Sequence, residues 1–138
     1  MENNNCIFCR IIAGEIPSAT VYEDDDFKAI MDISPANKGH VILLPKKHCA
    51  TLFEIEDSMA AKVLPAAKKI AHALQAELNC EGMNLLQNNG EAAGQTVFHF
   101  HLHLIPRYQG DPVNMTWEHG KYEDGEAVAL AASIASRL

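Results

Sequence analysis

Histidine and apolar residues alternate strictly in one segment, His99-Phe100-His101-Leu102-His103-Leu104. Because successive side chains of a β-strand point to opposite faces, this period places the three histidines on one face and the apolar side chains on the other. We therefore expect a strand over residues 97–107 whose apolar face packs on the core. Histidine is not a residue that strands favour for packing, so the row of imidazoles indicates a chemical role.

Hydrophobic periodicity predicts one long helix and four further strands. Asp57 or Ser58 could cap the start of the helix, and Pro65 is expected to kink it or to break its first turn. The expected elements are strands at 19–23, 27–32, 40–45 and 83–88, a helical turn through Ile11 and Ile12 that ends at Gly14, the long helix to Leu78, and a last helix at 126–136. Neighbouring strands with one long helix between them indicate an α+β fold with an antiparallel sheet.

Length and composition limit the classes of protein. The chain has 138 residues, 48% of them apolar, which suits one domain spanning residues 1–138. It carries 11 Lys and Arg against 18 Asp and Glu, without a basic cluster, so nucleic acid is not an expected partner. No apolar run approaches the roughly 20 residues of a membrane-spanning helix, and residues 1–5 do not resemble a signal peptide. We expect a cytoplasmic protein with reduced cysteines and no membrane partner.

Three aligned imidazoles allow two kinds of chemistry. All three could bind one metal ion that activates water, although the outer pair would have backbones about 13 Å apart and both rings would have to bend inward. Alternatively, the central histidine, neutral near pH 7, attacks an electrophilic phosphorus while its neighbours orient it and bind the phosphate oxygens. The residues alone leave both mechanisms open.

The segment from His99 to Ile105 resembles the His-φ-His-φ-His-φ-φ signature of the histidine triad (HIT) nucleotide hydrolases and transferases. Further motifs occur in the family's order: Asp32-Ile33-Ser34-Pro35, Lys38-Gly39-His40-Val41, Pro45-Lys46-Lys47-His48, Gly94-Gln95-Thr96-Val97 and Ile105-Pro106-Arg107-Tyr108. The last is most similar to the bacterial Hint-like or Hit branch. The resemblance covers residues 6–111 and leaves 112–138 as a tail. It implies a HIT-like fold, a five-stranded antiparallel sheet with one long helix and shorter helices, and a homodimer with a ten-stranded sheet.

Carried over residue by residue, the resemblance implies a catalytic set and a nucleotide-binding set. His101 would be the nucleophile that attacks the α-phosphorus, supported by His103 and His40. Asp32 would accept hydrogen bonds from ribose hydroxyls. The other nucleotide-binding candidates are Ile33 and Phe8 for an apolar purine slot, Asn88 near the scissile bond, and Gly94, Gln95 and Thr96 in a phosphate loop. Independently of the family, glycines and a threonine hydroxyl suit a loop that brings donors close to an anion.

The implied reaction forms a nucleotidyl-histidine intermediate and releases a nucleoside monophosphate. Nucleoside phosphoramidates, aminoacyl adenylates and dinucleoside polyphosphates are the implied substrates, with a purine base that these residues do not assign to adenosine or guanosine. That chemistry requires no metal ion. The alternatives are a metal-activated hydrolase that uses the same histidines and a nucleotide-sensing binding module.

Cys6-Ile7-Phe8-Cys9 supplies two thiolates at the spacing of half a tetrahedral zinc site. His48 and His99 are the expected other ligands, in an arrangement similar to that of some family members. Such an ion would be structural and would tie the N-terminal segment to the strand that carries His101. A redox dithiol and plain buried cysteines are the alternatives, and Cys49, next to His48, is a competing ligand.

Overall fold

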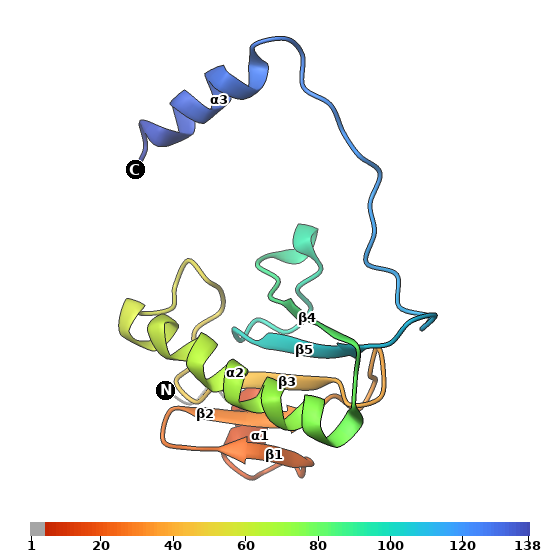
Figure 1. The fold of residues 1–138 in the computed structure, drawn as a ribbon. Helices are drawn as coiled ribbons and strands as arrows, with labels where there is room; N and C mark the ends of the chain where they lie inside the picture. The colour runs from red at the N-terminus through yellow and green to blue at the C-terminus, as the bar shows by residue number, and fades with distance from the viewer. Residues whose placement is uncertain (1–4) are drawn as a thin grey trace.

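One antiparallel sheet organises the part of the chain that the structure describes. The structure, a computed structural model, describes residues 5–138. Within these residues five strands run in the order β1-β2-β3-β5-β4, and every neighbouring pair is antiparallel (Figure 1). Their bounds are β1 Thr20–Glu23, β2 Phe27–Met31, β3 Val41–Pro45, β4 Gly82–Leu86 and β5 Leu102–Arg107. The predicted α+β class and the five-stranded antiparallel sheet are confirmed.

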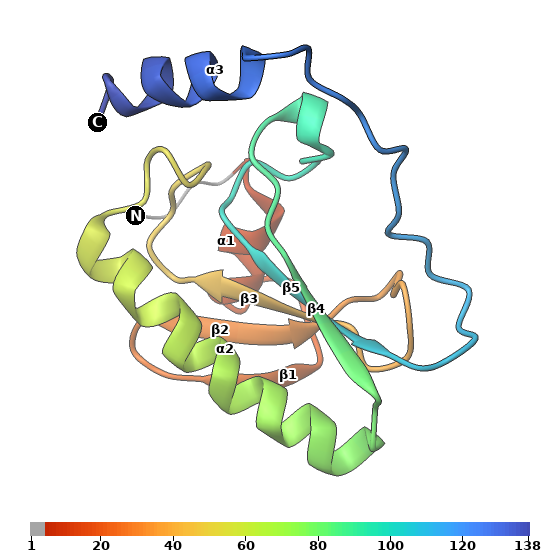
Figure 2. The same ribbon diagram turned by 45° about the horizontal axis from the view of Figure 1, so that its top comes forward.

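Two helices pack on opposite faces of this sheet (Figures 1 and 2). The long helix α2 (Asp57–Leu78) covers one face, and the short α1 (Ile7–Ile12) covers the other. Elsewhere in residues 5–138 there are a short 3-10 helix, η1 (Glu91–Ala93), and the helix α3 (Glu126–Ala135). The predicted long helix is therefore confirmed, as are the short N-terminal and the C-terminal helices.

The long helix α2 differs from its prediction in two details. Its N-cap is Glu56, which makes no side-chain capping bond, so neither Asp57 nor Ser58 caps it. The helix also continues through Pro65, so the expected break in its first turn is wrong. A proline removes one backbone donor, and because Pro65 and Ala61, four residues before it, are both exposed, water can reach the carbonyl left unpaired.

The central strand β3 supplies side chains to both faces of the sheet. All of its residues are buried. Val41 and Leu43 belong to the apolar cluster under α2, whereas Ile42 and Leu44 belong to the cluster under α1. A strand covered on both faces requires a continuous apolar run rather than an alternating one, and β3 has such a run.

The strand β5 begins at Leu102 rather than at residue 97, which corrects the prediction. The pairing of β3 with β5 ends at Leu43 and Leu102. Beyond that point the carbonyl of Pro45 accepts a bond from the His99 side chain (Nε2 to oxygen 2.8 Å), and proline has no N–H to donate to a neighbouring strand. The sheet ladder therefore cannot continue through residues 97–101.

The predicted alternation of faces nevertheless holds along this segment. Phe100, Leu102 and Leu104 all lie in the cluster under α2. His103 pairs with Ile42, a residue of the cluster under α1. The histidines therefore lie on the face of the sheet that α1 partly covers.

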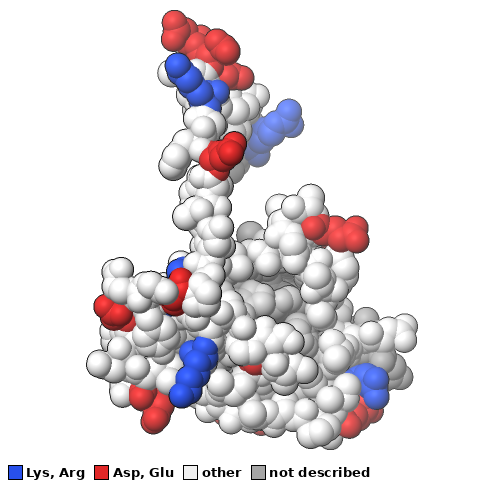
Figure 3. Space-filling model, turned by 90° about the vertical axis from the view of Figure 1, so that its right-hand side faces the viewer, with Lys and Arg blue, Asp and Glu red and all other residues white. Residues whose placement is uncertain are grey.

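The C-terminal tail leaves the sheet after β5 and ends in α3. Figures 1 and 2 both show it arching away from the strands, and Figure 3 shows it standing clear of the rest of the surface. No residue of α3 is buried. Across residues 5–138, no helix combines the length and the apolar character needed to cross a membrane.

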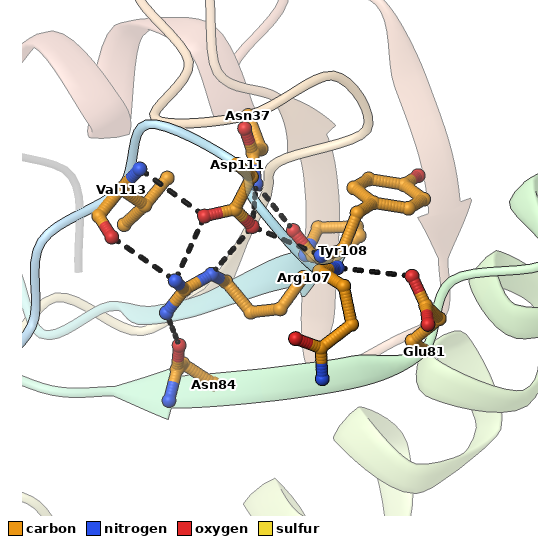
Figure 4. A network of polar contacts seen from close by, with 9 residues as sticks. Asn37, Glu81, Asn84, Arg107, Tyr108, Asp111 and Val113 are labelled. Carbon is orange, nitrogen blue, oxygen red and sulfur yellow. Dashed lines mark hydrogen bonds and ion pairs between the residues drawn. The ribbon is translucent and has the colours of Figure 1, made fainter.

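A polar network fixes the point where this tail begins (Figure 4). Arg107, at the end of β5, donates to both carboxylate oxygens of Asp111, at 2.8 and 2.9 Å, and to the carbonyl of Val113 at 3.0 Å. Asn37 donates to Asp111 as well, and Asn84 of β4 accepts a bond from Arg107. The guanidinium holds the pKa of the Asp111 carboxyl well below its usual range. The network anchors the chain to the sheet as far as Val113.

Replacing Leu104 with alanine should lower the free energy of unfolding by about 2–5 kcal/mol, because this fully buried side chain packs beneath α2 and its truncation leaves a cavity. Leu64→Ala is the matched control: Leu64 is 63% exposed on α2, and its loss should change stability by less than about 0.5 kcal/mol. Urea denaturation followed by circular dichroism measures both. Equal losses in the two variants would contradict the packing described.

Candidate active site and metal centre

The three histidines of the row have three different surroundings. His99 belongs to one group of potential metal ligands and His103 to another, whereas His101 belongs to neither. The groups are Cys6, Cys9, His48 and His99, and Asp32, His40 and His103. Within residues 5–138 no such group contains all three histidines of the row. The geometry therefore gives no support to a single ion shared by the row.

A backbone carbonyl holds His101 in one tautomer. Its Nδ1 lies 2.6 Å from the carbonyl oxygen of His99, and only a protonated nitrogen can donate to that oxygen. A neutral ring then carries its lone pair on Nε2, where it can act as a nucleophile. The ring of Phe8, from α1, packs edge-on against the His101 ring with the centroids 5.0 Å apart. The nucleophile candidate is thus held on two sides.

A chain of hydrogen bonds fixes the tautomers of His40 and His103. The N–H of Ala36 donates to His40 Nδ1 at 3.0 Å, so the proton of a neutral His40 lies on Nε2. That Nε2 lies 2.9 Å from Nδ1 of His103, which must accept, and the N–H of His103 is therefore on its own Nε2. The rings of His103 and His101 are neighbours, with centroids 4.9 Å apart. The ring next to His101 therefore carries a hydrogen-bond donor on its Nε2.

The turn before β3 positions His40. Asp32 Oδ1 accepts the N–H of Ser34 at 2.8 Å, and the N–H of Asp32 donates to the carbonyl of His40 at 2.9 Å. Gly39 has φ +93°, and a Cβ there would overlap the side chain of Leu78 at the end of α2. Glycine is favoured at this position because a residue with a side chain rarely adopts this φ, and the Leu78 side chain would also have to move.

Burial keeps these imidazoles neutral near pH 7. It lowers the pKa of His40 and of His101, although the Asp32 carboxylate opposes the shift in both, as does the His99 carbonyl for His101. The pKa of His103 falls to about 4, because burial and the neighbouring imidazoles of His101 and His40 all disfavour its charged form. The lone pair on His101 Nε2 is therefore available at neutral pH.

Four ligand atoms converge around the start of α1. Cys6 Sγ lies 3.3 Å from His99 Nδ1, and Cys9 Sγ lies 3.3 Å from His48 Nδ1 and 3.5 Å from His99 Nδ1. The two Nδ1 atoms are 3.2 Å apart. Because His99 Nε2 donates to the carbonyl of Pro45, its lone pair is on Nδ1, facing the two sulfurs and His48.

These spacings fit a tetrahedral zinc ion. With Zn–S about 2.3 Å and Zn–N about 2.0–2.1 Å, two nitrogens lie about 3.4 Å apart and a nitrogen and a sulfur about 3.6 Å apart. The observed nitrogen–nitrogen separation of 3.2 Å and nitrogen–sulfur separations of 3.3–3.5 Å are close to these values. Two thiols and two imidazoles are also donors that zinc prefers. Cys49, the competing ligand considered above, is not in this group.

The two residues expected to form a purine slot lie in different surroundings. Phe8 is buried against the rings of His99 and His101. Ile33, by contrast, is 97% exposed on the turn after Asp32. Asp32 itself is half-buried, with Oδ2 3.5 Å from His40 Nε2. Asp32 and the catalytic candidates are therefore neighbours, whereas Ile33 extends into solvent beside them.

The expected phosphate loop is held in shape by Gln95. This side chain is buried; its Oε1 accepts the N–H of Gly90 at 2.7 Å, and its Nε2 donates to two backbone carbonyls. Gly94 has φ +94°, a conformation that favours glycine, and a Cβ there would lie 3.8 Å from the amide nitrogen of Asn88. Thr96 is exposed at the end of the loop. Gln95 thus supports the loop from inside, and Thr96 faces outward.

The backbone groups that set the tautomers leave no signal in the sequence. They are the N–H of Ala36 and the carbonyls of Pro45 and His99. Every non-proline residue carries both groups, so residue identity does not mark the ones that contact a side chain. The turn residues Pro35 and Gly39 were the available sign that the chain bends there.

Known proteins of one family resemble this chain along nearly its whole length. The model of the HIT domain matches residues 13–110. The chain is 47% identical to "Protein hit" of Bacillus subtilis over 137 residues, which cover 97% of this chain and 94% of that protein. It is 36% identical to adenosine 5'-monophosphoramidase hnt1 of Schizosaccharomyces pombe over 135 residues, which cover 97% of this chain and 98% of that protein.

Two solved structures agree with this relationship. The crystal structure of a HIT family member from Bacillus subtilis has a TM-score of 0.92 at 46% identity, covering 98% of both chains. A Zn-bound histidine triad family protein from Mycobacterium smegmatis has a TM-score of 0.76 at 36% identity, covering 96% of this chain and 97% of that one. The fold and the histidine row define a histidine triad protein, and the chain belongs to the HIT family.

Long-range ¹H–¹⁵N NMR at pH 7 should show His101 protonated on Nδ1 alone and His40 on Nε2 alone, because backbone groups fix both tautomers. Burial lowers both pKa values, so both rings should stay neutral as the pH falls through 6.5, the value of an ordinary histidine. The urea-unfolded chain is the control, in which the same rings should titrate near that value. A His101 ring protonated on Nε2 at pH 7 would contradict the assignment.

Proposed function

We propose that this chain is a nucleotide hydrolase that cleaves purine nucleoside 5′-phosphoramidates through a nucleotidyl intermediate on His101. The observation that carries the proposal is a buried, neutral His101 whose Nδ1–H is bonded to the His99 carbonyl, which leaves Nε2 as the nucleophile. The phosphoramidase activity in the name of the Schizosaccharomyces pombe relative supports the reaction class. Aminoacyl adenylates and dinucleoside polyphosphates contain the same α-phosphorus and are proposed as further substrates.

In the first displacement, the lone pair of His101 Nε2 forms a bond to the α-phosphorus while the bond from phosphorus to the leaving nitrogen breaks. The leaving nitrogen takes a proton from solvent and departs as the amine. The ring becomes positively charged, and the His99 carbonyl that accepts its Nδ1–H stabilises that charge. The N–H on Nε2 of His103 donates to a phosphate oxygen, and His40 holds His103 in the tautomer that can do so.

In the second displacement, water attacks the same phosphorus. The Nε2–phosphorus bond breaks, its electron pair returns to Nε2 of His101, and the proton of the attacking water passes to solvent. The product is a nucleoside monophosphate, and the ring is restored to its neutral tautomer. One hard step is thereby divided into two easier ones.

The nucleotide would lie between the turn after β2 and the loop before residue 97. Asp32 would accept the ribose hydroxyls, and the exposed side chain of Ile33 would cover the base. Gly94 and Thr96 would donate to phosphate oxygens, with Asn88 close by. We assign Gln95 and Phe8 to the same site as supports, since one holds the loop and the other packs on the nucleophile.

We also propose that Cys6, Cys9, His48 and His99 bind a structural zinc ion. When bound, the ion would cross-link α1 to the segments that carry the two histidines. His99 would thus have two roles: its side chain would bind the ion, and its backbone carbonyl orients the nucleophile His101. A closed set of four protein ligands leaves no position for an activated water, which is typical of structural zinc. The Zn-bound Mycobacterium smegmatis neighbour supports this assignment.

We further propose that the chain is one HIT domain spanning residues 1–138, with the motif resemblance over residues 6–111, and that two copies form a homodimer. Residues 1–4, which the domain would include, lie outside the described part of the chain. The dimer rests on the family resemblance.

The variant His101→Ala should lose on the order of 10⁴-fold or more in kcat/KM for adenosine 5′-phosphoramidate, because it lacks the Nε2 on which the proposed intermediate forms. Release of adenosine monophosphate, separated by chromatography, measures the rate. His72→Ala, on the exposed side of α2, is the matched control and should be unchanged. Wild-type turnover by His101→Ala would contradict the proposed nucleophile. Tight binding without any turnover by the wild-type chain would instead indicate a nucleotide-sensing module.

Metal analysis of the purified protein should give about one zinc ion per chain, because the four ligands form one closed site. Cys9→Ser should lower this content severalfold, since a hydroxyl is a poor zinc ligand. Cys49→Ser, a cysteine next to His48 but outside the group, should keep the full content. A Cys9→Ser protein with undiminished zinc would disprove this ligand set. Brief EDTA treatment should leave turnover unchanged if the ion is structural and should abolish it if the ion activates water.

A further inference from the structure

Three consecutive carboxamide side chains, Gln87-Asn88-Asn89, follow β4 and come directly before Gly90, where the expected phosphate loop begins. All three residues are half-buried. The proposed reaction places Asn88 near the scissile bond but uses neither Gln87 nor Asn89. The contacts of these two outer carboxamides show how the middle residue is held.

The two outer carboxamides bond to each other. Asn89 Nδ2 donates to Gln87 Oε1, and Gln87 Nε2 donates to Asn89 Oδ1 at 2.9 Å. Gln87 Nε2 also donates to the backbone carbonyl of Asn88 at 3.2 Å. A reciprocal pair of this kind requires both side chains on one side of the backbone. Asn88 lies between them in the sequence, and its own side chain takes no part in the pair.

The Asn88 side chain instead lies beside the phosphate loop. A Cβ built on Gly94 would be 3.8 Å from Asn88 Nδ2. Within residues 5–138, no hydrogen bond is made to the Asn88 carboxamide. Its donor and acceptor atoms are therefore available to a bound nucleotide.

The outer pair is tied to a turn between β3 and α2, residues 50–54, named here the anchor turn. The N–H of Leu52 donates to Asn89 Oδ1 at 2.6 Å, and the carbonyl of Ala50 accepts from Gln95 Nε2 at 2.7 Å. Because β3 and β4 are both antiparallel to β5, they run in the same direction, and the anchor turn and the phosphate loop follow at the same end of the sheet (Figures 1 and 2). The anchor turn thus holds the loop at two points.

The anchor turn is itself fixed in place. The carbonyl of Thr51 accepts the N–H of Glu54 at 3.1 Å, which closes the turn. Just before it, the carbonyl of Cys49 accepts the N–H of Phe100 at 2.7 Å, and Phe100 is the neighbour of His101 in the sequence. Asn89 is therefore bonded to a support that is also bonded to the segment carrying the proposed nucleophile.

Precise placement matters for a donor at a reacting phosphorus. Such a donor stabilises the transition state when it is held where negative charge develops, and a displacement of about 1 Å can cost about 100-fold in rate. An Asn88 carried on an unsupported segment would have to be ordered in each turnover, which costs conformational entropy. The bonds of Asn89 order this segment before substrate binds. Because both outer carboxamides are uncharged, they do so without repelling a phosphate.

We propose that Asn89 is a positioning residue: bonded to Gln87 and to the N–H of Leu52, it holds Asn88 with its carboxamide facing the scissile bond. This inference rests on the proposed hydrolase function and adds to it a residue that acts without touching the substrate. Asn88 then donates to the phosphoryl group in the transition state, and Asn89 contributes to the rate only through Asn88.

A double-mutant cycle tests this dependence, with steady-state hydrolysis of adenosine 5′-phosphoramidate as the measurement. Asn88→Ala and Asn89→Ala should each lower kcat by about 10- to 100-fold and change KM by less than about threefold, because the interaction is made in the transition state. The double variant should be no more than about twofold slower than Asn88→Ala. Losses that multiply in the double variant would show that Asn89 acts independently of Asn88 and would overturn the proposal.

Thr51→Val is the matched control. It removes a hydroxyl that accepts the N–H of Phe53 at 3.2 Å within the anchor turn but makes no bond to the phosphate loop, so kcat should stay within about twofold of wild type. A loss as large as that of Asn89→Ala would show that any disturbance of the turn suffices, and would overturn the specific role of Asn89. A wild-type chain that does not hydrolyse the substrate would overturn the proposed function and this role together.

Water exchange of the side-chain carboxamide protons, followed by NMR in the wild-type protein, tests the same assignment if Asn89→Ala does not fold. Without ligand, the Asn89 protons should exchange on the order of 10-fold more slowly than those of Asn88, because only the Asn89 carboxamide is hydrogen-bonded. Adenosine monophosphate should slow exchange at Asn88 and leave Asn89 unchanged. Equal exchange in the free protein, or slowing at Asn89 alone, would contradict the proposal.

Discussion

The hydrogen bond from His101 Nδ1 to the carbonyl of His99 is the interaction on which the site depends. It fixes the tautomer, and it exists because the regular strand β5 begins only at Leu102. A carbonyl inside a continuous sheet ladder would be bonded to a neighbouring strand. At His99 the ladder has ended, since Pro45 has no N–H and its own carbonyl accepts from the His99 ring. The end of the regular strand thus leaves the His99 carbonyl available to accept the Nδ1–H of His101, the proposed nucleophile.

Burying several imidazoles costs solvation free energy, which their partners offset. Within residues 5–138 no buried side-chain nitrogen or oxygen lacks a hydrogen-bond partner. His40 is bonded to a backbone N–H and to His103, whereas His99 is bonded to a backbone carbonyl and faces the thiols. The three rings of the row are neutral for a common reason, which is burial, but they differ in the nitrogen that carries the proton. That difference allows one short segment to contain the proposed metal ligand His99, the proposed nucleophile His101 and the proposed donor His103.

Much of the fold could be predicted because it depends on periodic patterns. The apolar run of β3 and the three- and four-residue spacing of α2 are local and strong, and the alternation around His101 identified the buried face correctly. The start of β5 could not be predicted, since it depends on where a distant partner, Pro45, stops pairing. The course of the C-terminal tail could not be predicted either, because the contacts at its base are long-range. Asp111 joins Arg107 to Asn37, which is far away in the sequence.

The stereochemical course at phosphorus tests the central claim most directly. An adenosine 5′-phosphoramidothioate of a single configuration, hydrolysed in ¹⁸O-labelled water, gives a product whose configuration reports the number of displacements. Each in-line displacement inverts the phosphorus. Two displacements, the first by His101, predict overall retention. Overall inversion would show that water attacks the substrate directly, and covalent catalysis by His101 would then be wrong.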